Sequence, residues 1–173
     1  MIVLLIIFIF IFYHNPFFSN SKIHSSNNVV ELSKIAKENM ETEVFSWSLS
    51  IPKIGLSQIK ISEGTDEETL AQFIGHFDET ALFNGNVGLA AHNRGSIKNY
   101  FQDLNLLEKG DLLYYTYQTE TRNYEVEEKI IISVYDWSYI KRKDSVNLLT
   151  LITCVENNPN ERLCIVAKER GKE

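Results

Sequence analysis

A cysteine and an arginine near the C-terminus are placed so that they could cooperate in nucleophilic chemistry. In "LTLITCVENNPNERLCIVAK", residues 149–168, Cys154 closes one apolar run and Arg162 opens the next. Pairing of the two runs as an antiparallel hairpin, with Cys154 opposite Arg162 across loop 155–161, sets Thr153 against Leu163 and Ile152 against Cys164. A cationic neighbour favours the nucleophilic thiolate. The guanidinium could also hold a substrate carbonyl, or the oxyanion that forms on attack.

A nucleophilic cysteine usually needs an acid–base partner. The chain has four histidines, and His14 and His24 belong to N-terminal segments outside the predicted domain. His92 ends the small-residue run "GNVGLAAH", where small side chains allow close approach of a ligand or a neighbouring backbone. His76 follows a predicted helix end, and for it we expect a surface or structural role. His92 is therefore the candidate partner of Cys154.

Short strands make up most of the chain around these residues. Residues 45–51 alternate apolar and serine side chains, which predicts a half-buried strand. Further strands are predicted at 56–62, at 87–92, at 110–119 and 124–137 joined around "ETRN", and in the hairpin described above. With only brief helices between them, the strands predict a mostly antiparallel β-barrel or sandwich.

Two short helical segments are expected between the strands. "TDEETLAQFIG" predicts a helix with Thr65 as its cap, Glu68 three residues later and Gly75 as its terminator. "SIKNYFQDL", residues 96–104, predicts a helical turn. The acidic residues Asp66, Glu67 and Glu68 fit a helix N-terminus, where the helix dipole favours negative charge.

The N-terminal segment predicts a membrane anchor. Residues 2–13 are apolar, and no small-residue cleavage site follows, which favours a retained anchor over residues 1–18 rather than a signal peptide. The run is shorter than the ~20 residues that span a bilayer as a helix, so we expect a few residues upstream of the recorded start; a buried core helix is the alternative. Residues 19–43 predict a tether and a short amphipathic helix, and residues 44–170 the catalytic domain.

Composition excludes several classes of protein. With 173 residues, 44% of them apolar, the chain is not disordered. A net charge of −6 without a strongly basic segment argues against nucleic-acid binding.

Two cysteines do not make a disulfide scaffold. Cys164 is expected to be a buried thiol, because diagonal neighbours lie ~7–8 Å apart. A zinc site formed by His76, His92, Cys154 and Cys164 is disfavoured by the ligand spacing.

Several blocks of sequence resemble one known family. "TLITC" at residues 150–154, an arginine on the following strand and the "LAAH" strand end resemble the sortases, membrane-anchored cysteine transpeptidases of Gram-positive bacteria. "IPKIGL", "EGTDEETL", "GHFDET", "GNVGLAAHNRG" and "FQDLNLLEKGD" are similar as well, so the resemblance covers about residues 51–168.

The resemblance implies a closed eight-stranded sortase-type β-barrel and a catalytic site of His92, Cys154 and Arg162. Cys154 would attack the Thr–Gly bond of an L-P-x-T-G-like sorting signal, His92 would protonate the leaving amine, and Arg162 would steady the substrate backbone and oxyanion. The expected partners are surface proteins with that signal, an amine of a peptidoglycan precursor, and the membrane. No cofactor is expected; calcium stimulation occurs in some sortases, but the acidic residues here are explained by the helix N-terminus.

The subclass and some alternatives stay open. The compact loop after Cys154, the lack of an apolar segment after Lys168 and the lack of an Asp-Pro-aromatic lid motif favour a class A-like or class D-like enzyme over a pilus polymerase. The expected location is the cell membrane, with one N-terminal pass and an extracellular catalytic domain. The alternatives are a non-catalytic, membrane-tethered β-domain that binds a cell-wall partner, and a hydrolytic or pilin-ligating variant of the enzyme.

Overall fold

The computed structural model describes residues 46–143 and 145–171 of the chain. The predicted anchor, tether and amphipathic helix lie outside these residues. Within the part that is described, no helix has the length and apolar character needed to cross a membrane.

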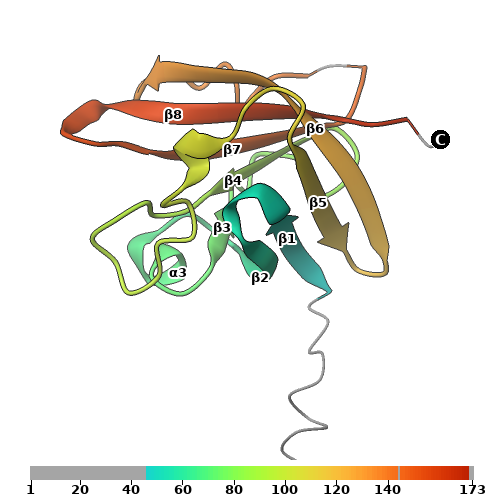
Figure 1. The fold of residues 1–173 in the computed structure, drawn as a ribbon, viewed down its shortest axis with the longest axis horizontal. Coiled ribbons are helices and arrows are strands. Elements are labelled where there is room, and N and C mark those ends of the chain that lie inside the picture. Colours follow the sequence, from blue (N-terminus) through green and yellow to red (C-terminus); the bar gives the residue numbers. More distant parts are fainter. Residues whose placement is uncertain (1–45, 144, 172–173) are drawn as a thin grey trace, which may run out of the picture. The chain divides into compact units, whose positions relative to one another are not determined.

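Eight strands close into a barrel, as predicted (Figure 1). The order around the barrel is β1-β2-β3-β4-β7-β8-β6-β5. The β2–β3 and β4–β7 pairs are parallel and the other pairs are antiparallel. The strands are β1 (Trp47–Ile51), β2 (Leu56–Glu63), β3 (Ile74–His76), β4 (Asn86–Ala90), β5 (Leu112–Tyr117), β6 (Glu120–Ser133), β7 (Leu148–Val155) and β8 (Asn158–Glu169). The helical elements are η2 (Pro52–Ile54), α3 (Glu67–Leu70) and η3 (Leu104–Leu106).

Apolar side chains are buried on both faces of the β7–β8 pair. The barrel interior holds the larger cluster, which includes Leu49, Ile51, Leu89, Tyr115, Leu151 and Ile165. A second cluster lies on the opposite face of these strands and consists of Ile132, Ile140, Leu148, Ile152, Cys164 and Val166. Its members come from β6, β7, β8 and the β6–β7 connection, so this connection covers the outside of the sheet.

The short helix predicted within residues 65–75 is present, but its cap and its terminator differ from the prediction. Asp66 is the N-cap and accepts a hydrogen bond from the backbone N–H of Thr69, and α3 ends at Leu70. Gly75 lies within β3, opposite Ser62 of β2 and Ala90 of β4. Two neighbouring strands supply hydrogen bonds to this short segment, and this outweighs its helical pattern.

Two further predictions need correction. The β5–β6 hairpin turns at residues 118–119, where Gln118 has a φ of 56°, so that "ETRN" belongs to β6. The segment 96–104 contains turns and the start of η3 rather than an α-helical turn.

The β7–β8 hairpin has the predicted register. Cys154 pairs with Arg162, Thr153 with Leu163, and Ile152 with Cys164. The predicted loop over 155–161 is wrong, because Val155 pairs with Asn158 and the chain reverses through residues 156–157, where Asn157 has a φ of 59°. Residues 159–161 therefore have no partner on β7 and form a bulge.

His76 is buried and structural, one of the two roles expected for it. Its Nδ1 lies 2.9 Å from Oε1 of Glu63, and its Nε2 lies 2.9 Å from Oγ1 of Thr80. The ring also contacts Trp47 at a centroid distance of 5.3 Å. These contacts join β1, β2 and β3 to the chain that leads into β4.

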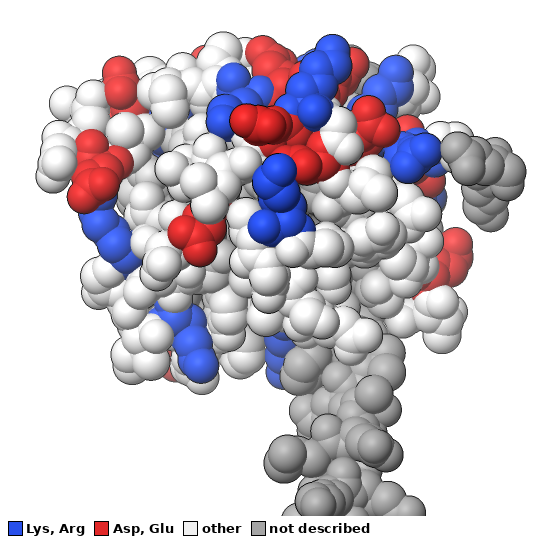
Figure 2. Space-filling model, in the orientation of Figure 1, with Lys and Arg blue, Asp and Glu red and all other residues white. Residues whose placement is uncertain are grey.

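Charges are mixed over the face drawn in Figure 2. Acidic and basic side chains alternate along its upper edge, where Figure 1 places β6 and β8. No patch of one sign spans that face, in agreement with the composition.

Replacing Gly75 by alanine is expected to destabilise the barrel. A Cβ at this position would lie 2.4 Å from the backbone carbonyl oxygen of Gly64. Backbone cannot move aside as a side-chain end can, so we expect a loss of about 1–3 kcal/mol in the free energy of unfolding, measured in urea. Gly171→Ala is the control, since nothing lies within 4 Å of the added atom; equal stability of the two variants would contradict the expectation.

Candidate active site

The parallel pairing of β4 with β7 sets the position of the candidate histidine and cysteine. Asn86 to Ala90 pair in register with Leu148 to Ile152. Parallel strands run in the same direction, so their C-terminal ends emerge at one edge of the sheet. His92 lies two positions after the end of β4. Cys154 lies two positions after Ile152, the last residue of β7 that pairs with β4. Both are thereby brought to one end of the barrel.

Two hydrogen bonds hold these strand ends together. The Thr153 hydroxyl donates to the backbone carbonyl of Ala91 at 2.8 Å, and the bond is buried. The Asn93 side-chain amide donates to the backbone carbonyl of Cys154 at 2.8 Å. Ala91 and Asn93, on either side of His92, are thus hydrogen-bonded to Thr153 and Cys154, respectively.

Arg162 reaches the same place from β8. Its Nη1 donates to the backbone carbonyl oxygens of Pro159 at 2.9 Å and Glu161 at 2.8 Å. These two hydrogen bonds, both donated by Nη1, stabilise the bulge at residues 159–161. A planar guanidinium has five N–H donors, which leaves others for a ligand.

All three candidate residues line one groove of about 340 Å³. The structure therefore brings His92, Cys154 and Arg162 to a common surface. The rest of the groove is largely apolar, with Leu70, Phe77, Ala90, Ala91, Ile132, Val134, Trp137, Ile140 and Ile152 among its lining residues. An extended peptide with apolar side chains would fit such a lining.

The β6–β7 connection forms one wall of this groove. Asn86, which is buried, donates from its amide to the backbone carbonyls of Tyr139 at 2.7 Å and Ile140 at 3.0 Å. Its own carbonyl oxygen accepts from the Thr150 hydroxyl at 2.8 Å. Trp137 packs edge-on against Phe77 at a centroid distance of 5.9 Å.

Sequence reasoning missed this wall. The predicted strand extended to residue 137, whereas β6 ends at Ser133 and the residues of the connection that line the groove lie between Val134 and Ile140. Trp137, one of two tryptophans in the chain, was the available signal.

The imidazole of His92 has a nitrogen without a hydrogen-bond partner. Nε2 is buried and unsatisfied, and the closest carboxylate oxygen recorded for it, from the exposed Glu67, is 3.6 Å away. That distance is beyond a good hydrogen bond. Nε2 therefore makes no hydrogen bond that a ligand would have to displace. Among the described residues, no group of three or more His, Cys, Asp or Glu side chains could hold a metal ion.

The two cysteines differ in environment, and neither is in a disulfide. Cys164 is fully buried in the outer cluster, as expected for a structural thiol. Burial raises the pKa of its thiol to about 12, and the carboxylates of Glu128 and Asp136 add to this. Cys154 is partly exposed and lines the groove.

The family model described as the sortase domain matches residues 49–170. Sortase A of Bacillus anthracis is 25% identical over 139 residues, which cover 79% of this chain and 65% of that protein. Sortase D of Bacillus subtilis (strain 168) is 30% identical over 132 residues, which cover 75% of this chain and 64% of that protein. The chain thus spans less than two thirds of either relative. The crystal structure of sortase C-1 from Actinomyces oris is similar with a TM-score of 0.68 and 26% identity, covering 81% of this chain and 82% of that one.

Alkylation should distinguish the two cysteines in the folded chain. We expect iodoacetamide at pH 8 to modify Cys154, which is accessible, at least about tenfold faster than Cys164, because a buried thiol with a raised pKa supplies little thiolate. Peptide mass spectrometry after timed quenching would measure both rates. In urea, where neither environment persists, the rates should converge; equal rates in the native protein would contradict the assignment.

Proposed function

Because the chain belongs to the sortase family, we propose that it is a transpeptidase that cleaves an L-P-x-T-G-like sorting signal between Thr and Gly and joins the threonine carbonyl to an amine of a cell-wall precursor. Cys154 is the nucleophile, His92 the acid–base group, and Arg162 the group that binds the substrate carbonyl and the oxyanion. The observation that carries the proposal is the common groove lined by these three residues.

The first half-reaction forms a thioester. The Cys154 thiolate attacks the threonine carbonyl carbon, and the negative charge that develops on the oxygen is stabilised by the remaining N–H donors of Arg162. As the C–N bond breaks, the proton on His92 passes to the glycine amine, which leaves as a free amino group. The unsatisfied Nε2 of His92 in the groove suits this role, because it needs no internal hydrogen bond to be broken first.

The lining of the groove supports the proposed signal. Its apolar lining, with Phe77, Trp137 and Ile152 from three different elements, suits the leucine and proline of such a peptide. The connection that carries Trp137 is fixed by Asn86, so the wall is preformed rather than assembled by the substrate. Preorganisation of this kind lowers the entropic cost of binding.

The wider setting belongs to the proposal as well. We propose a cell-membrane location with the catalytic domain outside, supported by the apolar residues 2–13. Surface proteins with the sorting signal are the proposed donors. A class A-like or class D-like enzyme that needs no cofactor is the form we favour, and a pilin-ligating or hydrolytic variant is the alternative.

Removing the thiol tests the chemistry directly. With the full chain and an L-P-x-T-G-type peptide, we expect Cys154→Ala to lower kcat/KM for cleavage by at least about a thousandfold, since no nucleophile remains. His92→Ala should cause a loss of similar size. The readout is chromatography and mass spectrometry of the cleaved peptide with and without an added glycine peptide as the amine.

Cys164→Ala is the matched control, because it removes the other thiol away from the groove, and it should retain cleavage. If Cys154→Ala cleaves and transfers like the parent, Cys154 is not the nucleophile and the proposed mechanism is excluded. If the parent itself neither cleaves nor transfers, the binding-domain alternative gains. The ratio of amide product to hydrolysed product in the parent separates a transpeptidase from a hydrolase.

A further inference from the structure

A second hollow, of about 440 Å³, adjoins the candidate nucleophile on a different side. It shares Thr153 and Cys154 with the groove described above, but neither His92 nor Arg162 lines it. Its apolar surface comes from Phe101, Ile130, Ile131, Val155 and Leu163, and its polar surface from Asn93, Gln102, Asn105, Lys129 and Glu156. Cys154 thus lines both hollows, and it also lines a smaller one at the tip of the β7–β8 hairpin.

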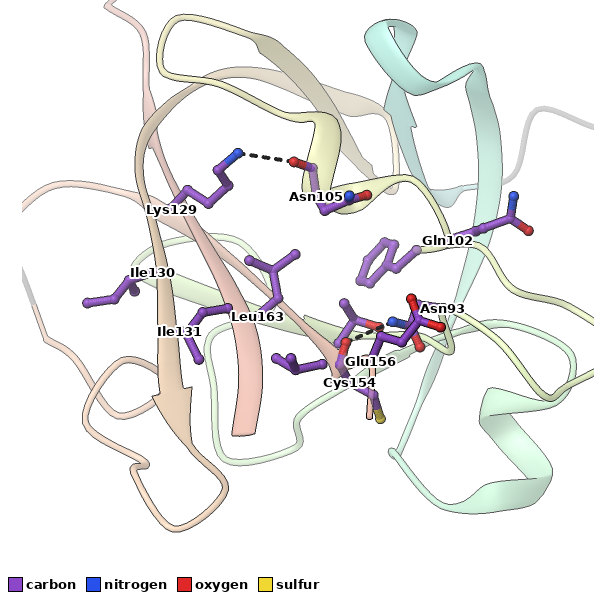
Figure 3. A pocket seen from close by; sticks show the side chains of 12 residues that line it. Asn93, Gln102, Asn105, Lys129, Ile130, Ile131, Cys154, Glu156 and Leu163 are labelled. Carbon is purple, nitrogen blue, oxygen red and sulfur yellow. Dashed lines mark hydrogen bonds between the residues drawn. The ribbon is translucent and has the colours of Figure 1, made fainter. Parts of the chain in front are cut away.

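Lys129 and Cys154 lie at opposite ends of this second hollow (Figure 3). The Lys129 ammonium donates to the backbone carbonyl of Asn105 at 3.0 Å, which fixes the long side chain over the hollow. An ammonium has three N–H donors, so this bond leaves two for a ligand. The neighbouring Glu128 instead accepts a hydrogen bond from the hydroxyl of Tyr139 at 3.5 Å, and Tyr139 packs against the outer cluster.

The other charged lining residue is already in an ion pair. The carboxylate of Glu156 lies 3.6 Å from Nη1 of Arg94, and both side chains are well exposed. The hollow therefore presents a paired carboxylate near the sulfur and an ammonium at its far end. A ligand that spans the hollow would therefore bind best if it carried a negative charge at the end that lies beside Lys129.

We infer that this second hollow receives the incoming nucleophile, and that Lys129 selects amines that also carry a carboxylate. The inference rests on the proposed function, since it names the second substrate of the same site. When the acyl part of the donor occupies the groove with His92 and Arg162, the amine approaches the thioester from the second hollow, because the hollow at the hairpin tip, which Cys154 also lines, shares Arg162 with the occupied groove. Its nitrogen lies at the Cys154 end and its carboxylate at Lys129.

The transfer step balances without any further reactant. The amine nitrogen attacks the thioester carbonyl, so that a C–N bond forms and the C–S bond breaks. The electron pair of the C–S bond stays on Cys154 as the thiolate. The proton lost by the amine goes to His92, which restores the ionic pair that began the reaction.

A pair of matched amines tests the inference on the full chain. At a fixed concentration of the L-P-x-T-G-type peptide, the KM values for glycylglycine and glycylglycinamide are measured, each corrected to its free-amine concentration. We expect the KM of glycylglycine to be lower by about fivefold, the size of one partly exposed ionic contact. Lys129→Gln should remove this difference and leave the rate of peptide cleavage in the first step unchanged. Lys168→Gln, an exposed lysine on β8, is the control and should keep the difference.

The other outcomes of this experiment would contradict the inference. Equal KM values for the two amines in the parent would overturn the inference while leaving the first step intact. A preference that survives Lys129→Gln but is lost in Arg94→Gln would also overturn it, because the nucleophile would then use the smaller hollow of about 370 Å³ at the hairpin tip, which Arg94 lines. If the parent fails to cleave the peptide at all, the proposed function fails, and the inference fails with it.

Discussion

The parallel pairing of β4 with β7 is the constraint on which the candidate site depends. It joins segments about sixty positions apart in the chain, Asn86–Ala90 and Leu148–Ile152, without any offset in register. Because β7 also pairs antiparallel with β8, the same strand fixes Cys154 relative to both His92 and Arg162. A shift of one residue in either ladder would turn the cysteine to the opposite face of the sheet. The hydrogen bonds from Thr153 and Asn93 resist such a shift at the point where the ladder ends.

Burial on both faces of β7 gives this arrangement its rigidity. Along the strand, Leu149 and Leu151 belong to the interior cluster and Leu148 and Ile152 to the outer one. The outer cluster exists only because the β6–β7 connection lies over it, and that connection is held by buried Asn86. Leaving the polar groups of Asn86 without partners at this depth would be costly, so the groove wall and the strand pairing stabilise one another.

The local sequence pattern and the pairing rules predicted most of the strands and the hairpin register. They failed where the structure of a segment is determined by residues far away in the chain. Alternation in residues 45–51 identified β1, and the apolar runs around Cys154 gave the register of the β7–β8 hairpin. Gly75 was taken as a helix terminator because its role, close approach to the carbonyl of Gly64, depends on a strand that the local pattern does not reveal. The hairpin bulge at 159–161 was missed because the strand continues there through pairing with β6, where Glu161 lies opposite Ser133, and not through pairing with β7. His92 and Cys154 were easier to find, since histidine and cysteine are rare in the chain and carry reactive groups. The wall at Val134–Ile140 was missed because its apolar and aromatic residues could equally belong to a core.

The place of the sulfur, where separate hollows meet, matters for any reaction with two substrates. A thioester on Cys154 would react with water, which is present at far higher concentration than any amine, unless the amine is bound beside it. Holding the two reactants in contact raises their effective concentration by orders of magnitude. One hollow alone could not do this, because the acyl group would fill it. Since the groove and the second hollow share only Thr153 and Cys154, both could be occupied at once with the reacting atoms in contact. Under the proposed function, the presence of two separate hollows favours transfer over hydrolysis. The two hollows can meet at Cys154 because β7 ends at the rim of the barrel rather than within it.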